Sequence, residues 1–266
     1  MITTIIIILL LIIIIYKKNI VSKFVNIKNK SCTDLKIYHL NWSDNKIKEV
    51  TNKSYNISRP NVLLVAGTHG NEPAGSVSLN NIIKKNNIKL KKGSITFISE
   101  VNPCGLRNNI RDTYNFGIGK FGGDINRTYP IKEGGKIKSK QAEIVINYVK
   151  KADYILDFHE GYSWYKIDKN SVGSTLTPSG FKNINKISEV IINKLNKNIT
   201  DENKEWMIRY DKSCDIYHTL NCYSYNIRKP YILIETAGQD DVQPLDIRVN
   251  QNYTIINGLL EELQMV

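Results

Sequence analysis

The fold is decided by the stretch VAGTHGNEPAG, residues 65–75, which follows an apolar run that begins at Asn61. The apolar run has the composition of a buried strand, and the glycines after it permit a tight turn into residues with helical periodicity. His69 and Glu72 stand three residues apart in this turn, so both side chains can point to one place. Imidazole nitrogens and carboxylate oxygens are ligands that suit Zn²⁺.

A second apolar run ends in a histidine, in the stretch ILDFHEG at residues 155–161. Open α/β sheets bind ligands at the carboxyl ends of their strands, where two such runs would meet. Considered alone, His69 and Glu72 could be an ordinary surface pair. The chain has only four histidines, however, and His159 supplies the third ligand that a hydrolytic zinc site needs beside an open position for water. The sequence therefore predicts a metal site.

The order of the predicted elements indicates the architecture. Strands are expected over residues 61–65, 93–101, 152–158 and 231–236, and helices over 73–85, 139–150, 180–195, 213–223 and 246–263, with an edge strand or hairpin within 35–50. This alternation predicts an α/β fold, a three-layer α/β/α sandwich on a mainly parallel, doubly wound mixed sheet. The polar segment 107–130 is long for a connection without structure, which favours a functional role.

The N-terminus is expected to lie outside this sandwich. Residues 2–15 are apolar except for two threonines, which predicts a hydrophobic anchor helix over 1–16 that attaches the chain to a membrane. A cleaved secretory signal is the alternative, because the run is shorter than the roughly 20 residues of a typical spanning helix. Residues 17–34 then form a polar tether and 35–266 the catalytic domain. The side of the membrane stays open, since the lysines after the run favour the cytosol and a signal-like insertion favours export.

Composition excludes some classes of function. The formal net charge is +12, which raises the question of nucleic acid as a partner. The lysines are spread along the whole chain without a basic patch or a known binding motif, so no nucleic-acid partner is expected. The four cysteines show no CxxC spacing, which argues against a cysteine zinc site.

Five segments, in this order, resemble the zinc metallocarboxypeptidase superfamily: GTHGNE at 67–72, NPCG at 102–105, DINR at 124–127, DFH at 157–159 and IET at 234–236. The superfamily includes carboxypeptidases, murein peptide amidases, and the succinylglutamate desuccinylase and aspartoacylase branch. The resemblance spans about residues 61–250. Cys104 stands where these families usually have aspartate, but this position holds no ligand, so the chemistry should survive.

The resemblance implies one Zn²⁺ ion bound by His69, Glu72 and His159. It also implies that Glu235 is the general base and acid. Bound zinc lowers the pKa of water toward roughly 7, and a nearby carboxylate can take its proton and pass it to the leaving amine.

The resemblance further implies how the substrate is held. Asn126 and Arg127 would bind a substrate carboxylate, because the planar guanidinium can bond both of its oxygens. Arg111 would polarise the scissile carbonyl, although Arg107 could fill the same role. No tyrosine can be assigned to the site, with Tyr217, Tyr223 and Tyr225 all available.

The predicted function is a zinc-dependent hydrolase, a metallocarboxypeptidase or peptide amidase, that cleaves an amide bond beside a carboxylate by glutamate-assisted attack of zinc-bound water. Its substrate would be a small peptide or an N-acyl amino acid with a free carboxylate. Residues 236–266 read as little more than one helix, which favours a minimal catalytic domain. An N-acyl amino acid deacylase of the desuccinylase and aspartoacylase type and a membrane-tethered, peptide-binding pseudoenzyme are the alternatives.

Deletion of residues 1–16 should leave a folded protein, because an apolar run with no polar face has no surface suited to packing within a soluble core. Far-ultraviolet circular dichroism and a cooperative thermal transition would test this. Loss of the transition in the truncated chain would mean that residues 2–15 belong to the domain.

Overall fold

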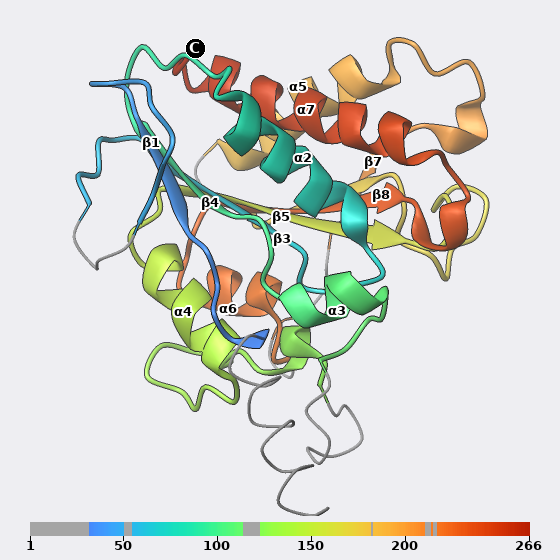
Figure 1. The fold of residues 1–266 in the computed structure, drawn as a ribbon. Coiled ribbons are helices and arrows are strands. Elements are labelled where there is room, and N and C mark those ends of the chain that lie inside the picture. The colour runs from blue at the N-terminus through green and yellow to red at the C-terminus, as the bar shows by residue number, and fades with distance from the viewer. Residues whose placement is uncertain (1–31, 51–54, 114–122, 182, 211–213, 215–216) are drawn as a thin grey trace, which may run out of the picture. The chain divides into compact units, whose positions relative to one another are not determined.

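The computed structural model describes residues 32–50, 55–113, 123–181, 183–210, 214 and 217–266. The chain divides into two units, residues 1–34 and residues 35–266, and all labelled helices and strands in Figure 1 belong to the second. The apolar run at residues 2–15 lies outside the described residues, so the predicted anchor is untested. None of the described helices is both long and apolar enough to cross a bilayer.

One sheet of eight strands runs through the second unit, in the order β2-β1-β4-β3-β5-β8-β6-β7. The strands are β1 (Tyr38–Asn41), β2 (Lys48–Glu49), β3 (Asn61–Ala66), β4 (Ser94–Ile98), β5 (Tyr154–Gly161), β6 (Thr175–Pro178), β7 (Met207–Ile208) and β8 (Tyr231–Ala237). The central strands β4, β3, β5 and β8 are mutually parallel, whereas β1 and β6 pair with them in antiparallel fashion. The predicted mixed α/β sheet is therefore confirmed.

Helices lie on both sides of this sheet (Figure 1). The α-helices in the described residues are α2 (Pro73–Lys85), α3 (Pro103–Asn108), α4 (Lys140–Val149), α5 (Ile184–Asn196), α6 (Leu220–Asn226) and α7 (Leu245–Glu262). Helices α2, α5 and α7 cover one face, and α3, α4 and α6 lie on the other. The result is the three-layer arrangement that the alternating elements predict.

The central strands are apolar because both of their faces are covered. Every residue of β3 and of β5 is buried, as expected for parallel strands between two helical layers. Successive side chains point to opposite faces, so Leu64 and Leu156 pack toward α2 and α7, whereas Leu63 and Ile155 pack toward α4. This double core fixes the strands whose ends carry the predicted ligands.

Local signals explain most of the element boundaries. Helix α2 starts at Pro73, a residue favoured in the first turn of a helix. It ends at Lys85, and Asn86 caps it with a left-handed φ of 47°. Helix α4 starts after Ser139, whose hydroxyl accepts the N–H of Ala142. The predicted edge hairpin is present as β1 and β2.

The sequence prediction differs from the structure beyond residue 170. Helix α6 begins at Leu220 rather than near residue 213, because the Thr219 hydroxyl caps it by accepting the N–H of Cys222. His218 therefore precedes the helix, and its Nδ1 lies 2.8 Å from the Tyr129 carbonyl oxygen. Strands β6 and β7 were not expected, since runs of four and two residues leave no readable alternation.

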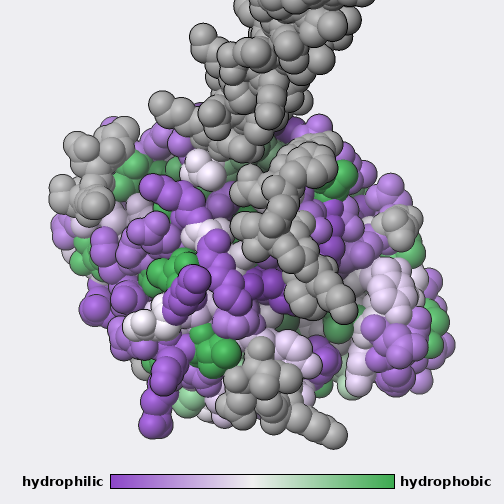
Figure 2. All heavy atoms as spheres, turned by 90° about the horizontal axis from the view of Figure 1, so that it is seen from below, coloured by the Kyte–Doolittle hydropathy of each residue, from purple (hydrophilic) through white to green (hydrophobic). Residues whose placement is uncertain are grey.

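The surface is consistent with the composition. On the part of the face that Figure 2 shows in colour, hydrophilic residues dominate and hydrophobic residues occur in small, scattered groups. Isolated apolar side chains are ordinary on a protein surface. This view thus gives no reason to expect a large apolar interface on that face.

Candidate active site

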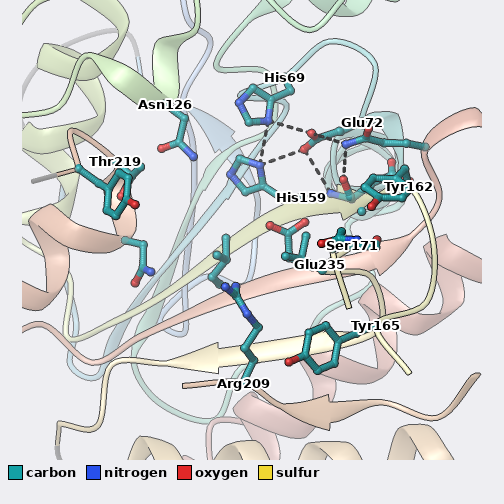
Figure 3. Close-up of a pocket in the computed structure, with 18 of the residues that line it drawn as sticks. His69, Glu72, Asn126, His159, Tyr162, Tyr165, Ser171, Arg209, Thr219 and Glu235 are labelled. Carbon is teal, nitrogen blue, oxygen red and sulfur yellow. Dashed lines mark hydrogen bonds and ion pairs between the residues drawn. The ribbon is translucent and has the colours of Figure 1, made fainter. Parts of the chain in front are cut away.

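A cleft of about 900 Å³ lies at the carboxyl ends of β3, β5 and β8. Parallel strands bring their carboxyl ends to one edge of the sheet, which is where open α/β folds place ligands. All of the predicted site residues except Arg107 line this cleft: His69, Glu72, Arg111, Asn126, Arg127, His159 and Glu235. Figure 3 shows the two histidines and Glu72 turned toward one another above Glu235.

The candidate metal ligands form a compact buried cluster. His69 Nδ1 lies 2.9 Å from Glu72 Oε1, and His159 Nδ1 lies 2.9 Å from Glu72 Oε2. The two Nδ1 atoms are 3.1 Å apart. All three side chains are nearly inaccessible to solvent, at 3–4% exposure. Two segments separated by 86 residues in the chain thus supply three ligand atoms that lie within 4.8 Å of one another.

A carboxylate lies behind each histidine. His69 Nε2 is 3.1 Å from Asp124 Oδ1, and His159 Nε2 is 3.4 Å from Asp157 Oδ1. The Tyr231 hydroxyl in turn donates to Asp157 Oδ2 at 2.6 Å. Metal-binding histidines typically use their second nitrogen in this way, which fixes the ring and makes the first nitrogen a better ligand.

The electrostatics of the cluster suit a cation. Burial alone would lower the pKa of His159, but Asp157 and Glu72 outweigh burial and raise that pKa well above its ordinary value. Burial would likewise raise the pKa of Glu72, but the two histidines hold it well below its ordinary value. The two Nδ1 atoms and the Glu72 oxygens carry lone pairs that would repel one another at these distances unless a proton or a metal ion lies among them. The donor set therefore fits a bound metal ion.

Glu235 stands beside this cluster on β8. The β5–β8 register pairs it with His159, so both side chains leave the sheet on the same face. Burial, and then the negative charges of Glu72 and Asp157, raise the pKa of Glu235 to about 8 despite the opposing His159 charge. A carboxyl group with a pKa near neutrality suits a general acid and base.

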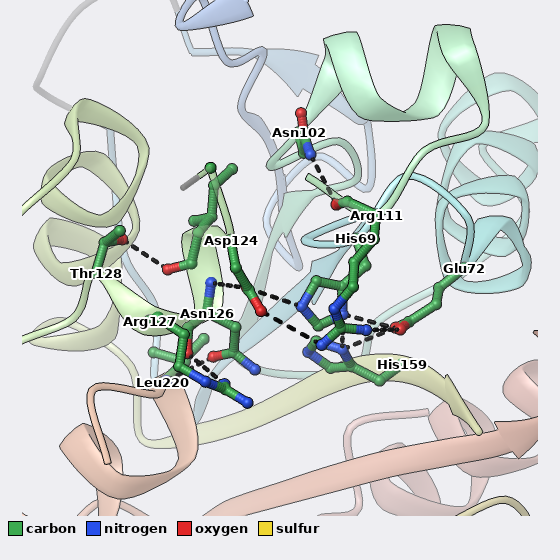
Figure 4. A network of polar contacts seen from close by, with 12 residues as sticks. His69, Glu72, Asn102, Arg111, Asp124, Asn126, Arg127, Thr128, His159 and Leu220 are labelled. Atoms are coloured by element: carbon green, nitrogen blue, oxygen red, sulfur yellow. Dashed lines mark hydrogen bonds and ion pairs between the residues drawn. The ribbon is translucent and has the colours of Figure 1, made fainter. Parts of the chain in front are cut away.

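Arg111 bridges two acids of the site. Its Nη1 donates to Glu72 Oε1 at 3.0 Å, and its Nη2 approaches Asp124 Oδ2 at 3.4 Å (Figure 4). Burial opposes ionisation of Asp124, but His69 and Arg111 lower its pKa to about 2. The Arg111 side chain is 41% exposed, so one side of its guanidinium faces the open cleft.

Asn126 and Arg127 come from a 3₁₀ turn, Ile125–Arg127. The Asp124 carboxylate caps this turn by accepting the Asn126 N–H at 2.8 Å. Asn126 Oδ1 accepts the Leu220 N–H at 3.0 Å, which leaves its amide nitrogen on the cleft side. Arg127 is held by a bond from its Nη1 to the Asn126 carbonyl oxygen at 2.8 Å. The same aspartate thus contacts the candidate ligand His69 and caps the start of this turn.

Arg107, the alternative to Arg111 for contact with the substrate, does not line the cleft. It lies in the last turn of α3, exposed, and its Nη2 contacts Cys104 Sγ at 2.9 Å rather than the cleft. Helix α3 ends at Asn108, and Asn109 has a left-handed φ of 50°. After this change of direction, Arg111 is the arginine that lines the cleft.

Several cleft residues were not predicted. Arg209 and Tyr165 line the wall opposite Asn126 (Figure 3), and Gln239 donates to Glu72 Oε1 at 2.9 Å. Nothing in the sequence near Arg209 marks a strand end, so it gave no signal. Asp124 and Asp157 could have been found, because each stands two residues before a predicted site residue.

The three candidate tyrosines have different positions. Tyr217 lines the cleft, whereas Tyr223 is buried in α6 and Tyr225 packs its ring against Phe181. Cys222 also lines the cleft and forms a disulfide with Cys214. Tyr217 thus lies within the loop that this disulfide closes.

The family model of the succinylglutamate desuccinylase/aspartoacylase catalytic domain matches residues 58–172. This range contains the three candidate ligands, Arg111, Asn126 and Arg127, but ends before Glu235. The resemblance to the zinc metallocarboxypeptidase superfamily is confirmed. A comparison with curated proteins found no match to the sequence.

Several solved structures share the fold of this chain. Csd4 from Helicobacter pylori, a cell shape determinant described as a D,L-carboxypeptidase, has a TM-score of 0.65 in its mDAP-bound form, at 20% identity over 78% of this chain and 51% of Csd4. Its tripeptide-bound form has a TM-score of 0.66, at 19% identity over 88% of this chain and 56% of Csd4. This chain thus spans about half the length of Csd4.

A candidate metallopeptidase from Shewanella amazonensis SB2B has a TM-score of 0.56, at 19% identity over 80% of each chain. An aspartoacylase family protein from Mesorhizobium loti has a TM-score of 0.50, at 18% identity over 78% of this chain and 58% of that protein. At such identities the likeness establishes a shared fold, and activity has to be argued from the site.

In the metal-free protein, Glu235 should make the free energy of unfolding fall as pH rises from about 4.5 to about 8. The pKa of Glu235 is about 8 in the folded protein, against an ordinary value of 4.5. Between these two pH values the folded state therefore binds more protons than the unfolded state, and the free energy of unfolding falls as pH rises. Melting temperatures of wild type and Glu235→Gln across this range would measure the effect. Parallel curves for the two proteins would contradict the raised pKa.

Proposed function

We propose that this chain is a zinc-dependent hydrolase that cleaves an amide bond beside a free carboxylate, as a metallocarboxypeptidase or peptide amidase does. The observation that carries the proposal is the cluster of His69, Glu72 and His159 in one cleft with Glu235. Three protein ligands leave a position open, which is the pattern of catalytic rather than structural zinc.

The structural neighbours support a peptide substrate. Csd4 is described as a D,L-carboxypeptidase and has been solved with a tripeptide and with mDAP. Both carry carboxylates, and the cleft of this chain has the cationic side chains Arg111, Arg127 and Arg209 along it. A cleft of about 900 Å³ also has room for more than one residue of a peptide.

Zinc, when bound, would act as a Lewis acid that polarises the scissile carbonyl and makes water easier to deprotonate. Glu235 would take the proton from the attacking water and donate it to the leaving amine. Burial favours the protonated form of Glu235, which would help it to hold the proton until the leaving amine takes it. Asp124 and Asp157 would keep the two histidine rings in place through each step.

The arginines would hold the substrate and stabilise developing charge. Arg127 lines the cleft and would bind the free carboxylate together with the Asn126 amide. Arg111 lies against Glu72 with part of its guanidinium exposed. It would donate to the oxygen of the scissile carbonyl as negative charge develops there.

An N-acyl amino acid deacylase is the second candidate, favoured by the desuccinylase and aspartoacylase family model that matches residues 58–172. Both candidates use the same metal, base and arginines and differ in what lies on the acyl side of the bond. A screen of the purified chain against peptides, murein peptides and N-acyl amino acids would separate them. Zinc binding without turnover of any substrate would instead indicate a pseudoenzyme.

Glu235→Gln should lower kcat by about 10²–10⁴-fold, because the amide keeps the shape of the side chain but cannot accept a proton. Zinc content, measured by atomic emission on the same preparations, should stay near one ion per chain. A variant with kcat close to wild type would show that Glu235 is not the base.

Arg127→Gln should mainly raise KM for substrates with a free carboxylate, because it removes a charge-assisted bond that forms on binding. Arg107→Gln is the matched control, since Arg107 is exposed and lies outside the cleft. Peptides with free and amidated C-termini would be compared on wild type and both variants. Equal use of free and amidated ends by wild type would argue against carboxylate recognition by Arg127.

A further inference from the structure

Glu160 follows the ligand His159 on β5, but its side chain lies on the opposite face of the sheet. Because successive side chains of a strand alternate, its carboxylate lies toward α2 and α7, where it is 1% exposed. Glu160 Oε1 accepts the N–H of Ala74 at 2.6 Å, and Oε2 pairs with Arg248 Nη1. Arg248 is itself buried, and it comes from the first turns of α7. A buried charged pair thus lies directly behind the metal ligands.

The contact with Ala74 places Glu160 at the start of α2. This helix begins at Pro73, and the residue before it, Glu72, makes no capping bond with its own side chain. The free N–H groups of a helix N-terminus favour a negative charge. Glu160 supplies that charge from the neighbouring strand, through Ala74, two positions after the ligand Glu72.

The backbone of Glu160 is bonded to the same ligand. Its N–H donates to Glu72 Oε2 at 3.2 Å. Gln239 Nε2 donates both to the Glu160 carbonyl oxygen at 2.5 Å and to Glu72 Oε1 at 2.9 Å. Side chain and backbone of Glu160 therefore connect the segment that carries Glu72 with the strand that carries His159.

We propose that Glu160, held in place by Arg248, is a positioning residue that sets the separation of Glu72 from His159 and so tunes the affinity for zinc. The inference rests on the proposed metal centre. Neither side chain would contact the metal or the substrate. Their effect passes through the N-terminus of α2 and through the Glu160 main chain, and removal of such supporting contacts typically weakens metal binding by about 10–100-fold.

Gly238 packs against the Glu160–Arg248 pair and leaves no space there for a larger residue. A Cβ at this position would overlap Glu160 Oε2 and the Cδ of Arg248. Its φ of −152° is open to any residue, so the constraint comes from space alone. Gly238→Ala should therefore displace the pair without altering any charge, which offers a second and independent perturbation.

The test compares full-length wild type, Glu160→Gln and Gly238→Ala. Zinc affinity would be measured by competition with a chromophoric chelator, and the zinc-induced rise in melting temperature would be recorded beside it, since binding to the folded state raises stability in proportion to ln(1 + [L]/Kd). Both variants should bind zinc about 10–100-fold more weakly and show a smaller zinc-induced rise. Glu261→Gln, which breaks the exposed pair of α7 with Lys194 on α5, is the matched control and should leave both values unchanged.

The outcomes separate the possible roles. Variants that melt earlier without zinc but keep the wild-type Kd would show that the pair only stabilises the fold, and would overturn the proposal. Absence of zinc binding by wild type would refute the metal centre itself. Glu160→Gln keeps an oxygen for Ala74, and Arg248 keeps Asp241 as a partner at 2.9 Å, so folding is expected. If Glu160→Gln does not fold, Arg248→Lys replaces it in the test, because lysine retains the buried charge on a differently shaped side chain. The same loss of zinc affinity is expected for Arg248→Lys.

Discussion

In the parallel pairing of β5 with β8, His159 lies opposite Glu235, and the site depends on this register. A shift of one residue would turn one of the two side chains to the opposite face of the sheet. The register is held by apolar residues that pack on both faces, with Ile155 toward α4 and Leu156 toward α2 and α7. The hydrophobic core therefore determines where the polar groups meet.

The second constraint is charge. Glu72, Asp124, Asp157 and Glu235 gather around two histidines, and burial makes each ionised carboxylate costly unless a positive group lies near it. Arg111 offsets part of this excess between Glu72 and Asp124. What remains is an excess of buried carboxylates around the two histidines, whose charge a divalent cation would neutralise. The raised pKa of His159 and the lowered pKa of Glu72 reflect the same imbalance.

The sequence predicted those parts of the site that are attached to strong local signals. His69, Glu72, His159 and Glu235 follow long apolar runs, and such runs identify strands and their ends. The helices α2 and α4 were predicted to within about a residue, because periodicity, proline and a capping serine agree there. These features are encoded within a few neighbouring residues.

The remainder depends on contacts between distant segments. Arg107 and Arg111 are equivalent in the sequence, and only the end of α3 and the turn after it decide which one reaches the cleft. Arg209 follows a two-residue strand whose pairing to β6 gives it a place in the wall. The proposed role of Glu160 depends on its ion pair with Arg248 in α7, which lies 88 residues later in the chain. Short-range patterns carry no information about such pairings.

The proposed base and one candidate metal ligand are attached to a different part of the molecule from the groups proposed for recognition. His159 and Glu235 lie within core strands, whereas Asn126 and Arg127 belong to a 3₁₀ turn in the connection between α3 and α4. Connections tolerate insertions and substitutions that strands do not. Natural selection could therefore exchange the substrates of this scaffold by changing Asn126 and Arg127, provided that Asp124 and Arg111 in the same connection were kept for the reaction. Laboratory evolution of new specificities would best begin with a library over these two positions.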